Sequence, residues 1–484
     1  MEREQVKTVV NIYNKMSLPA RASFWYFVCN VFQRGISVIT TPIFTRILST
    51  DQYGLVSIYT SWEAIITIFA TLNFGAGVFN NAMVRYENDR NGYTSVIQTW
   101  TTIITGVIFF VYFLTRNFWN DILGLNTALM IMMFVDIAFT AGMSFWTVRN
   151  RYEYKYLSVC IFTLLASILV PLVSIVFTYL TDIHKSEAKI FGTVLVHIII
   201  YGVVYILNLK NGKKVWNREY IVYSTKFSIP LIPHYLSQNV LNQADRIMIR
   251  DMVSIAKAGI YSVAYQAGML INIVTSSVNA SFVPYLYENL KEKNYAKIGN
   301  LAIKIELLIG SICFLFSLLA PELLKMLATE KYFEAIWIIP PVAMSSLFMM
   351  LYSFFTNVEF FFEKNKFIMV ASVITAILNI VLNRIFITFY GYIAAGYTTL
   401  ICYVIYAMAQ YFFMLHICKC KNIPNPYNGG IMWVIALCFI VLSIFSEILY
   451  KTVLIRFIVL GILVVIVGVI CKIYGKQILK LIRR

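Results

Sequence analysis

Two stripes of polar side chains lie within segments that are long enough to cross a membrane. One stripe is Asn30, Arg34, Ser37, Thr41 and Thr45, and the other is Tyr235, Asn239, Asn242, Arg246 and Arg250. In both stripes the members are 4, 3, 4 and 4 positions apart, and this spacing places side chains on one face of an α-helix. Such a face can line a water-filled pathway and bind polar or charged groups there.

Arg34 shows most clearly that the first stripe is functional. It lies about 12 residues inside its span, roughly 18 Å deep at the rise of an α-helix, and is too deep to reach either interface easily. A guanidinium facing lipid there would cost at least about 2.5–3.5 kcal/mol. Arg34 must therefore either pair with an acid, for which Glu63 and Asp136 are candidates, or face a cavity. The accompanying polar stripe favours the cavity.

Two prolines precede the second stripe. Pro230 and Pro233 remove backbone donors and predict a break or bend in the first half of this helix, and Pro42 lies within the first span. A bend beside a polar face could serve as a gate, although static kinks are common in membrane helices. Asp245 flanks the second stripe, and we expect it to pair with an adjacent arginine, Arg246 or Arg250, rather than to carry a proton.

Acidic residues within spans are candidates for ion coupling or for salt bridges. Asp136 is the deepest and is the first candidate for an ion-coupled carboxylate; Asp245 and Glu63 are the others. We expect His197 to be a packing residue. Glu306 lies near the end of its predicted span, where reaching toward the interface would keep its charge in water.

The composition places these residues in a membrane. The chain has 484 residues, of which 60% are hydrophobic and 13% charged, and its mean hydropathy is +0.73. Apolar runs of roughly 20 residues recur throughout and match the thickness of the hydrocarbon layer. We predict an all-α integral membrane protein with about 14 transmembrane helices. No signal peptide is expected, and the loops are too short for a separate soluble domain.

The loops alternate in positive charge. With the N-terminus in the cytosol, cytosolic loops hold about 25 Lys and Arg and outer loops about ten, which predicts that both termini are cytoplasmic. This bias accounts for most of the net charge of +17 without a nucleic-acid partner. The basic C-terminal tail should lie along the anionic inner leaflet.

Motifs for most catalytic classes are missing from the sequence. There is no phosphate-binding glycine loop, zinc-binding helix motif or Gly-x-Ser-x-Gly elbow. The eight cysteines include no Cys-x-x-Cys pair, so no metal site is expected. An ATP-driven pump of the P-loop class is excluded.

A short repeat links the two stripes. Arg46 precedes Gly54 by eight positions and Arg250 precedes Gly259 by nine, and a Tyr- and Ser-containing helix start follows each glycine. The copies lie in spans 1 and 7, so they cross the membrane in the same direction. This pattern predicts a cytoplasmic segment (1–21), an N-lobe of six helices (22–215), a C-lobe of six helices (216–420) and two further helices with a basic tail (421–484).

The residues around the repeat resemble a known family. Asp245-Arg-Ile-Met-Ile followed by Gly259-Ile-Tyr-Ser-Val-Ala, and Thr-Pro42-Ile-Phe-Thr-Arg46 leading to Gly54, resemble the polysaccharide transporter family of lipid-linked oligosaccharide flippases. That family shares a superfamily with the multidrug and toxin extrusion exporters and the lipid II flippases. The resemblance implies two six-helix lobes in a V with pseudo-twofold symmetry.

The resemblance also implies a function and a site. Such proteins carry an undecaprenyl-diphosphate-linked oligosaccharide from the inner to the outer leaflet of the bacterial cytoplasmic membrane, for capsule or O-antigen synthesis. Because arginine matches phosphate geometry with two parallel hydrogen bonds, cavity arginines would bind the diphosphate. The expected cleft residues are Arg34, Arg246, Arg46, Arg250, Asn30, Asn239 and Asn242. No cofactor is expected except a coupling ion, H⁺ or Na⁺; possible protein partners are the polysaccharide polymerase and the chain-length machinery.

Two alternatives stay open. An ion-coupled multidrug exporter of the same fold would carry cationic substrates, which arginines in the cavity disfavour. A membrane polysaccharide polymerase or ligase would need a sizeable outer loop with catalytic residues, and the longest loop here is about a dozen residues.

Overall fold

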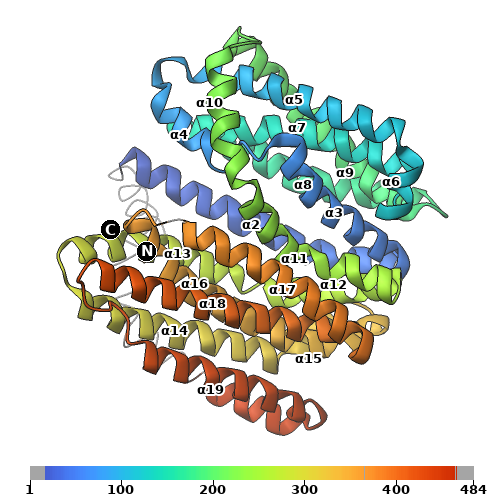
Figure 1. Ribbon diagram of the computed structural model, residues 1–484. Helices are drawn as coiled ribbons and strands as arrows, with labels where there is room; N and C mark the ends of the chain where they lie inside the picture. Colours follow the sequence, from blue (N-terminus) through green and yellow to red (C-terminus); the bar gives the residue numbers. More distant parts are fainter. Residues whose placement is uncertain (1–16, 365, 464, 466–484) are drawn as a thin grey trace, which may run out of the picture. The chain divides into compact units, whose positions relative to one another are not determined.

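The computed structural model of the protein describes residues 17–364, 366–463 and 465. Within these residues every regular element is a helix (Figure 1), which confirms the predicted all-α class. Most of the predicted N-terminal segment (1–21) and the basic tail lie outside the described residues.

The helices divide between two compact units. Unit 1 contains the chain up to Leu48 and from Tyr59 to Tyr235; unit 2 contains Ser49–Ile58 and the chain from Leu236 onward. The helices of unit 1 are α2 (Leu18–Ile47), α4 (Val78–Arg85), η1 (Glu87–Asp89), α5 (Arg90–Leu114), α6 (Arg116–Leu123), α7 (Thr127–Tyr152), α8 (Tyr156–Leu180), α9 (Lys185–Gly212), α10 (Arg218–Ser228) and η2 (Ile229–Leu231). Two helices, α3 (Thr50–Thr71) and α11 (Ile232–Met252), each contribute to both units.

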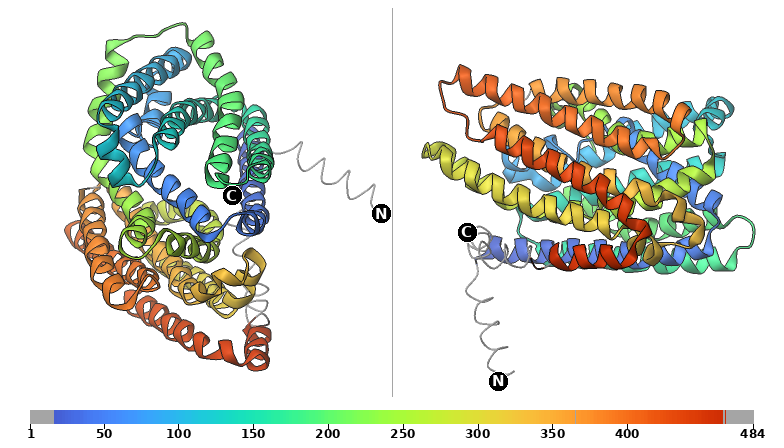
Figure 2. Two further views of the ribbon diagram at one scale, coloured as in Figure 1. Left: turned by 90° about the vertical axis from the view of Figure 1, so that its right-hand side faces the viewer. Right: turned by 90° about the horizontal axis from the view of Figure 1, so that it is seen from below.

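The remaining helices belong to unit 2. They are α12 (Ile255–Met269), α13 (Asn272–Lys291), α14 (Tyr295–Leu318), α15 (Ala320–Leu327), η3 (Glu330–Ile338), α16 (Ile339–Phe361), α17 (Lys366–Tyr390), α18 (Ala394–Cys420), α19 (Gly429–Ile448) and η4 (Leu449–Lys451). In this unit α18 packs along α16 and α17, and α19 packs along α14 (Figure 2). In unit 1, α9 packs along α7 and α8, and α2 along α8. The predicted lobe boundaries and the V arrangement stay predictions.

Eleven helical segments of the described residues are long and apolar enough to cross a membrane. The predicted number of 14 is therefore not confirmed. The predicted spans 1 and 7 do form helices, α2 and α11, but neither is among the eleven. Their polar stripes lower the hydropathy that defines a span. The last predicted span, near 452–474, is described only as a short apolar helix, Val453–Leu463.

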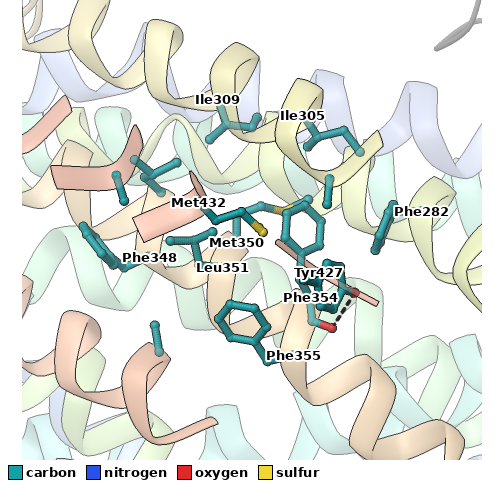
Figure 3. Close-up of a cluster of buried hydrophobic side chains, with 14 of the residues drawn as sticks. Phe282, Ile305, Ile309, Phe348, Met350, Leu351, Phe354, Phe355, Tyr427 and Met432 are labelled. Atoms are coloured by element: carbon teal, nitrogen blue, oxygen red, sulfur yellow. Dashed lines mark hydrogen bonds between the residues drawn. The ribbon is translucent and has the colours of Figure 1, made fainter. Parts of the chain in front are cut away.

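Each unit has its own apolar core. In unit 2, Phe282 and Phe354 have ring centroids 4.6 Å apart, and the Tyr427 hydroxyl donates to the Phe354 carbonyl oxygen at 2.9 Å (Figure 3). In unit 1 the rings of Phe79 and Phe145 stack with centroids 4.8 Å apart. Aromatic pairs of this geometry add about 0.5–1.5 kcal/mol to the stabilisation from burial alone.

The chain is bent where the two prolines were found. Helix α10 ends at Ser228, a 3-10 turn covers Ile229–Leu231, and α11 starts at Ile232. Pro230 lies in the turn and Pro233 in the first turn of α11, where a missing backbone N–H costs little. The predicted interruption is present, and the chain passes from unit 1 to unit 2 within the next turn. A role as a gate stays a prediction, as it does for Pro42, which lies inside α2.

The two glycines of the repeat pack against each other inside unit 2. A Cβ atom built on Gly259 would lie 2.7 Å from the backbone nitrogen of Gly54, and one built on Gly54 would overlap the carbonyl oxygen of Ile255. The start of α3 and the start of α12 therefore approach so closely that only hydrogen fits at these positions.

This contact predicts a loss of stability on adding one methyl group. Gly259→Ala should lower the free energy of unfolding by about 1–3 kcal/mol, because backbone atoms must move apart to admit the Cβ. The matched control is Gly106→Ala in α5, where no atom lies within 4 Å of the new Cβ. Thermal unfolding of the detergent-solubilised protein measures both variants, and equal midpoints would contradict the close contact.

Candidate functional site

The first polar stripe has an exposed half and a buried half. Asn30, Arg34 and Ser37 are exposed on α2. Thr41 and Thr45 are buried, and their hydroxyls donate to carbonyl oxygens of their own helix. The part of the stripe that is available to a ligand is therefore centred on Arg34.

Arg34 is far from both ends of its helix. It lies 16 residues after Leu18 and 13 before Ile47, so its Cα is about 20 Å or more from either end at 1.5 Å per residue. An exposed guanidinium at such a depth cannot be solvated by lipid tails. Arg46, one residue before the end of α2, is also exposed, and its Nη1 donates to the Pro42 carbonyl oxygen at 2.9 Å.

The second stripe is much less exposed. Arg246 is buried; its guanidinium donates to the Asn242 carbonyl oxygen and lies over the Tyr265 ring, 4.1 Å from the centroid. Asn239 is half-buried. Arg250 pairs with Asp251, the next residue along the chain. Direct binding of substrate by these side chains stays a prediction, because the structure places Arg246 in the packing of unit 2.

Asp245 is the centre of a buried polar cluster in unit 2. One carboxylate oxygen, Oδ2, accepts hydrogen bonds from the Tyr261 hydroxyl at 2.6 Å and the Thr399 hydroxyl at 2.9 Å. The other, Oδ1, accepts from the Asn383 amide at 2.6 Å. Every partner is neutral. No direct ion pair of Asp245 with an arginine is found among the described residues: Arg250 pairs with Asp251, and the Arg246 guanidinium lies over Tyr265. The charge of Arg246 is nevertheless within electrostatic range of Asp245.

A second layer of polar side chains surrounds this carboxylate. The Thr398 hydroxyl donates to the Asn383 side-chain oxygen, and the Asn383 amide also lies 3.3 Å from the side-chain oxygen of Asn379. All of these side chains are at most 1% exposed. Hydroxyl, carboxylate and amide oxygens from α11, α12, α17 and α18 thus gather around one buried negative charge. A buried carboxylate whose hydrogen-bond partners are all neutral is a candidate site for a proton or a cation.

Unit 1 has a separate acidic cluster. The Asp136 carboxylate lies 2.6 Å from Nδ1 of His197, whose ring stacks on Tyr201 with centroids 4.5 Å apart. Glu63 is within hydrogen-bonding reach of Asp136. Glu63, Asp136 and His197 thus form a cluster of three groups that could hold a proton. Neither acid pairs with Arg34 in this arrangement.

The structure adds residues that the sequence did not single out. Asn379 and Asn383 are spaced four apart on an apolar helix, and this spacing is a signal that could have been used. His197 was expected only to pack, yet it contacts the deepest acid, from a helix about 60 residues away. Glu306 was expected to reach an interface and instead is fully buried. Its place in α14 faces the core of unit 2, which a linear sequence does not show.

Comparison with known proteins identifies the family. Residues 20–290 match the model of a family described as "Polysaccharide biosynthesis protein". The chain belongs to this family. Among curated relatives, "Lsg locus putative protein 1" of Haemophilus influenzae is 22% identical over 362 residues, which are 73% of this chain and 88% of the relative.

Solved structures show the same fold. "Lipid II flippase MurJ, inward closed conformation" aligns with a TM-score of 0.69 at 17% identity, over 94% of this chain and 99% of that chain. An inward-facing multidrug resistance MATE family transporter of the MOP superfamily aligns with a TM-score of 0.58 at 13% identity, over 82% of this chain and 95% of that chain. This polysaccharide biosynthesis family member therefore has the fold of the MOP superfamily. Family and candidate spans together indicate a multi-pass membrane protein of polysaccharide biosynthesis, and its fold is one that solved transporters share.

Proposed function

We propose that the protein is an alternating-access flippase that moves a polyprenyl-diphosphate-linked oligosaccharide, with undecaprenol as the lipid, from the inner to the outer leaflet. Arg34 is the observation that carries the proposal. It is an exposed guanidinium near the middle of the 30-residue helix α2, which the sequence predicts to span the membrane, and it is flanked by the exposed polar side chains of Asn30 and Ser37. Such a position requires water or an anionic ligand, and a diphosphate provides two phosphate groups for its donor fork.

The family supports a saccharide rather than a drug as cargo. The family is one of polysaccharide biosynthesis, and the solved lipid II flippase shares the fold. A diphosphate head and a glycan cannot cross hydrocarbon without a polar route, because each unsatisfied polar group costs several kcal/mol there. A cationic drug would be repelled by Arg34.

We further propose that a cation, Na⁺ or H⁺, drives the cycle from the Asp245 cluster. The buried carboxylate has only neutral hydrogen-bond partners, and binding a cation there would offset part of the cost of burying its charge. The surrounding oxygens suit a hard cation such as Na⁺, by the same preference that Ca²⁺ and Mg²⁺ show. The acids of unit 1, Glu63 and Asp136 with His197, are a second candidate and suit a proton.

The test is transport by the purified full-length protein in proteoliposomes. A fluorescent polyprenyl-diphosphate oligosaccharide placed in one leaflet should appear in the other, and imposing a Na⁺ or H⁺ gradient should raise the rate. Empty vesicles give the background. If the vesicles accumulate a cationic dye and leave the lipid-linked saccharide in place, the exporter alternative replaces this proposal.

The cellular setting follows from the same proposal. The chain would lie in the bacterial cytoplasmic membrane with both termini in the cytosol, and it would hand its product to a polymerase and the chain-length machinery on the outer side. Single cysteines introduced in loops of a cysteine-free variant, labelled from each side, test the orientation.

A further inference from the structure

Polar side chains continue along α18 beyond the Asp245 cluster. Thr399, Tyr403, Tyr406 and Gln410 are spaced 4, 3 and 4 apart on one face of this helix, and none is more than 1% exposed. Four consecutive members of a helical face are thus both polar and fully buried. Packing alone would favour apolar residues at such positions.

The facing helix carries a matching set. The Thr399 hydroxyl donates to Asp245 at 2.9 Å, and the Tyr403 hydroxyl donates to the Asn242 side-chain oxygen at 3.2 Å. One turn further, the Tyr406 hydroxyl lies close to the amide of Gln238. These three contacts between α11 and α18 define a continuous polar file that starts at the Asp245 cluster.

The file ends at a buried carboxyl group. Glu359 on α16 is 0% exposed and lies within electrostatic range of Tyr406. Neither Glu359 carboxylate oxygen has a hydrogen-bond partner, and neither has either side-chain amide atom of Gln410. The Tyr406 hydroxyl, though near the Gln410 amide, makes no hydrogen bond of regular geometry.

The unpaired polar atoms at this end of the file suggest that a ligand binds there. Buried polar atoms are nearly always paired, and each unpaired one lowers stability. Five such atoms belong to Glu359, Gln410 and Tyr406, on the two helices α16 and α18 that pack along each other, and four of the five are oxygens. Oxygen ligands around a carboxylate favour a hard cation.

We propose that Glu359, Gln410 and Tyr406 form a second binding site for a small monovalent cation, Na⁺ or H⁺, connected to the Asp245 cluster by the polar file of α11 and α18. The inference rests on the proposed cation coupling and deepens it, because it supplies a route by which the ion reaches or leaves Asp245. The charged groups of α11 beside the file are Asp245 and Arg246, and α18 carries no charged residue before Lys419.

Glu306 provides a matched control for this site. It is also 0% exposed, and neither of its carboxylate oxygens has a partner, but it lies on α14, outside the file. Glu306→Gln therefore removes the same chemical group from an equally buried position in the same unit. Glutamine preserves the volume in both variants, so the fold should be retained.

The experiment measures ion binding by the full-length protein in nanodiscs, with radioactive sodium and, separately, with proton uptake after an acid pulse. Glu359→Gln should lose one bound equivalent of the coupling ion, and Glu306→Gln should match the unsubstituted protein. A sodium loss identifies Na⁺ as the ligand, and a loss of proton uptake alone identifies H⁺. Unchanged binding of both ions in Glu359→Gln, or the same loss in Glu306→Gln, would overturn the second site.

Asp245→Asn separates this inference from the proposed coupling. If Asp245→Asn loses one equivalent and Glu359→Gln loses none, the cluster at Asp245 is the whole binding site and the second site is wrong. If Glu359→Gln loses one equivalent and Asp245→Asn loses none, the second site stands and the coupling role of Asp245 falls.

Discussion

Replacing Arg34 by alanine should lower the rate of transport of the lipid-linked oligosaccharide by about 100-fold. Loss of charge-assisted hydrogen bonds to a phosphate is worth up to about 3 kcal/mol, and each 1.4 kcal/mol is tenfold. Stability should change little, because the side chain is exposed on α2. The leaflet-exchange assay in proteoliposomes measures the rate, and thermal unfolding checks the fold.

Two further variants sharpen this test. Arg34→Lys retains the charge but loses the planar donor fork, so its rate should lie between those of the unsubstituted protein and Arg34→Ala. Arg116→Ala removes an exposed arginine from α6, where the guanidinium lies 5.4 Å from the Phe113 ring centroid, and should transport normally. Normal transport by Arg34→Ala would remove Arg34 from the site.

Replacing Asp245 by asparagine should abolish the dependence of transport on the driving cation and lower the driven rate by at least about 100-fold. Asparagine retains the shape and one acceptor oxygen but removes the charge that a bound cation neutralises. The gain in thermal stability on adding the coupling ion should vanish as well, since a ligand stabilises only a fold that binds it. Transport with and without the gradient, together with unfolding midpoints at several sodium concentrations, measures both effects.

The control for this variant is Asp121→Asn. Asp121 is an exposed acid on α6 of unit 1, away from both acidic clusters, so its loss should affect neither cation dependence nor stability. If Asp245→Asn retains full cation dependence while Glu63 or Asp136 variants lose it, the coupling site lies in unit 1. Asp245 would then be a structural carboxylate that holds α11, α12, α17 and α18 together.

The class of the protein could be predicted from the sequence for a simple physical reason. A helix that crosses hydrocarbon must form all its backbone hydrogen bonds within itself and present apolar side chains over about 20 residues. Each span can therefore be recognised from one short stretch of sequence. The polar stripes could be recognised from a short stretch as well, because residues three or four positions apart lie on the same face of a helix. The bend at Pro230 and Pro233 was readable as well, since proline acts on its own turn.

The number of membrane spans was harder to predict from the sequence. Hydropathy counts a span by its apolar content, and α2 and α11 are helices of ample length whose polar stripes lower that content. The features that suggested function in these two helices are the ones that exclude them from the count. The prediction of two long helices was therefore confirmed, while the span count was not, and the function of their stripes stays a prediction.

The amino-acid sequence by itself determined that the chain is a polytopic helical membrane protein with arginines within two polar helices. Only the tertiary structure decided which polar side chains contact each other. Asp245 meets Thr399 across 154 positions and Asp136 meets His197 across 61, and no local spacing encodes contacts between helices so far apart. Burial was decided in the same way: Arg34 and Arg246 both belong to polar stripes with the same spacing, yet Arg34 is exposed and Arg246 packs on Tyr265. The helices that surround each stripe, rather than the stripe itself, set how much water each guanidinium meets.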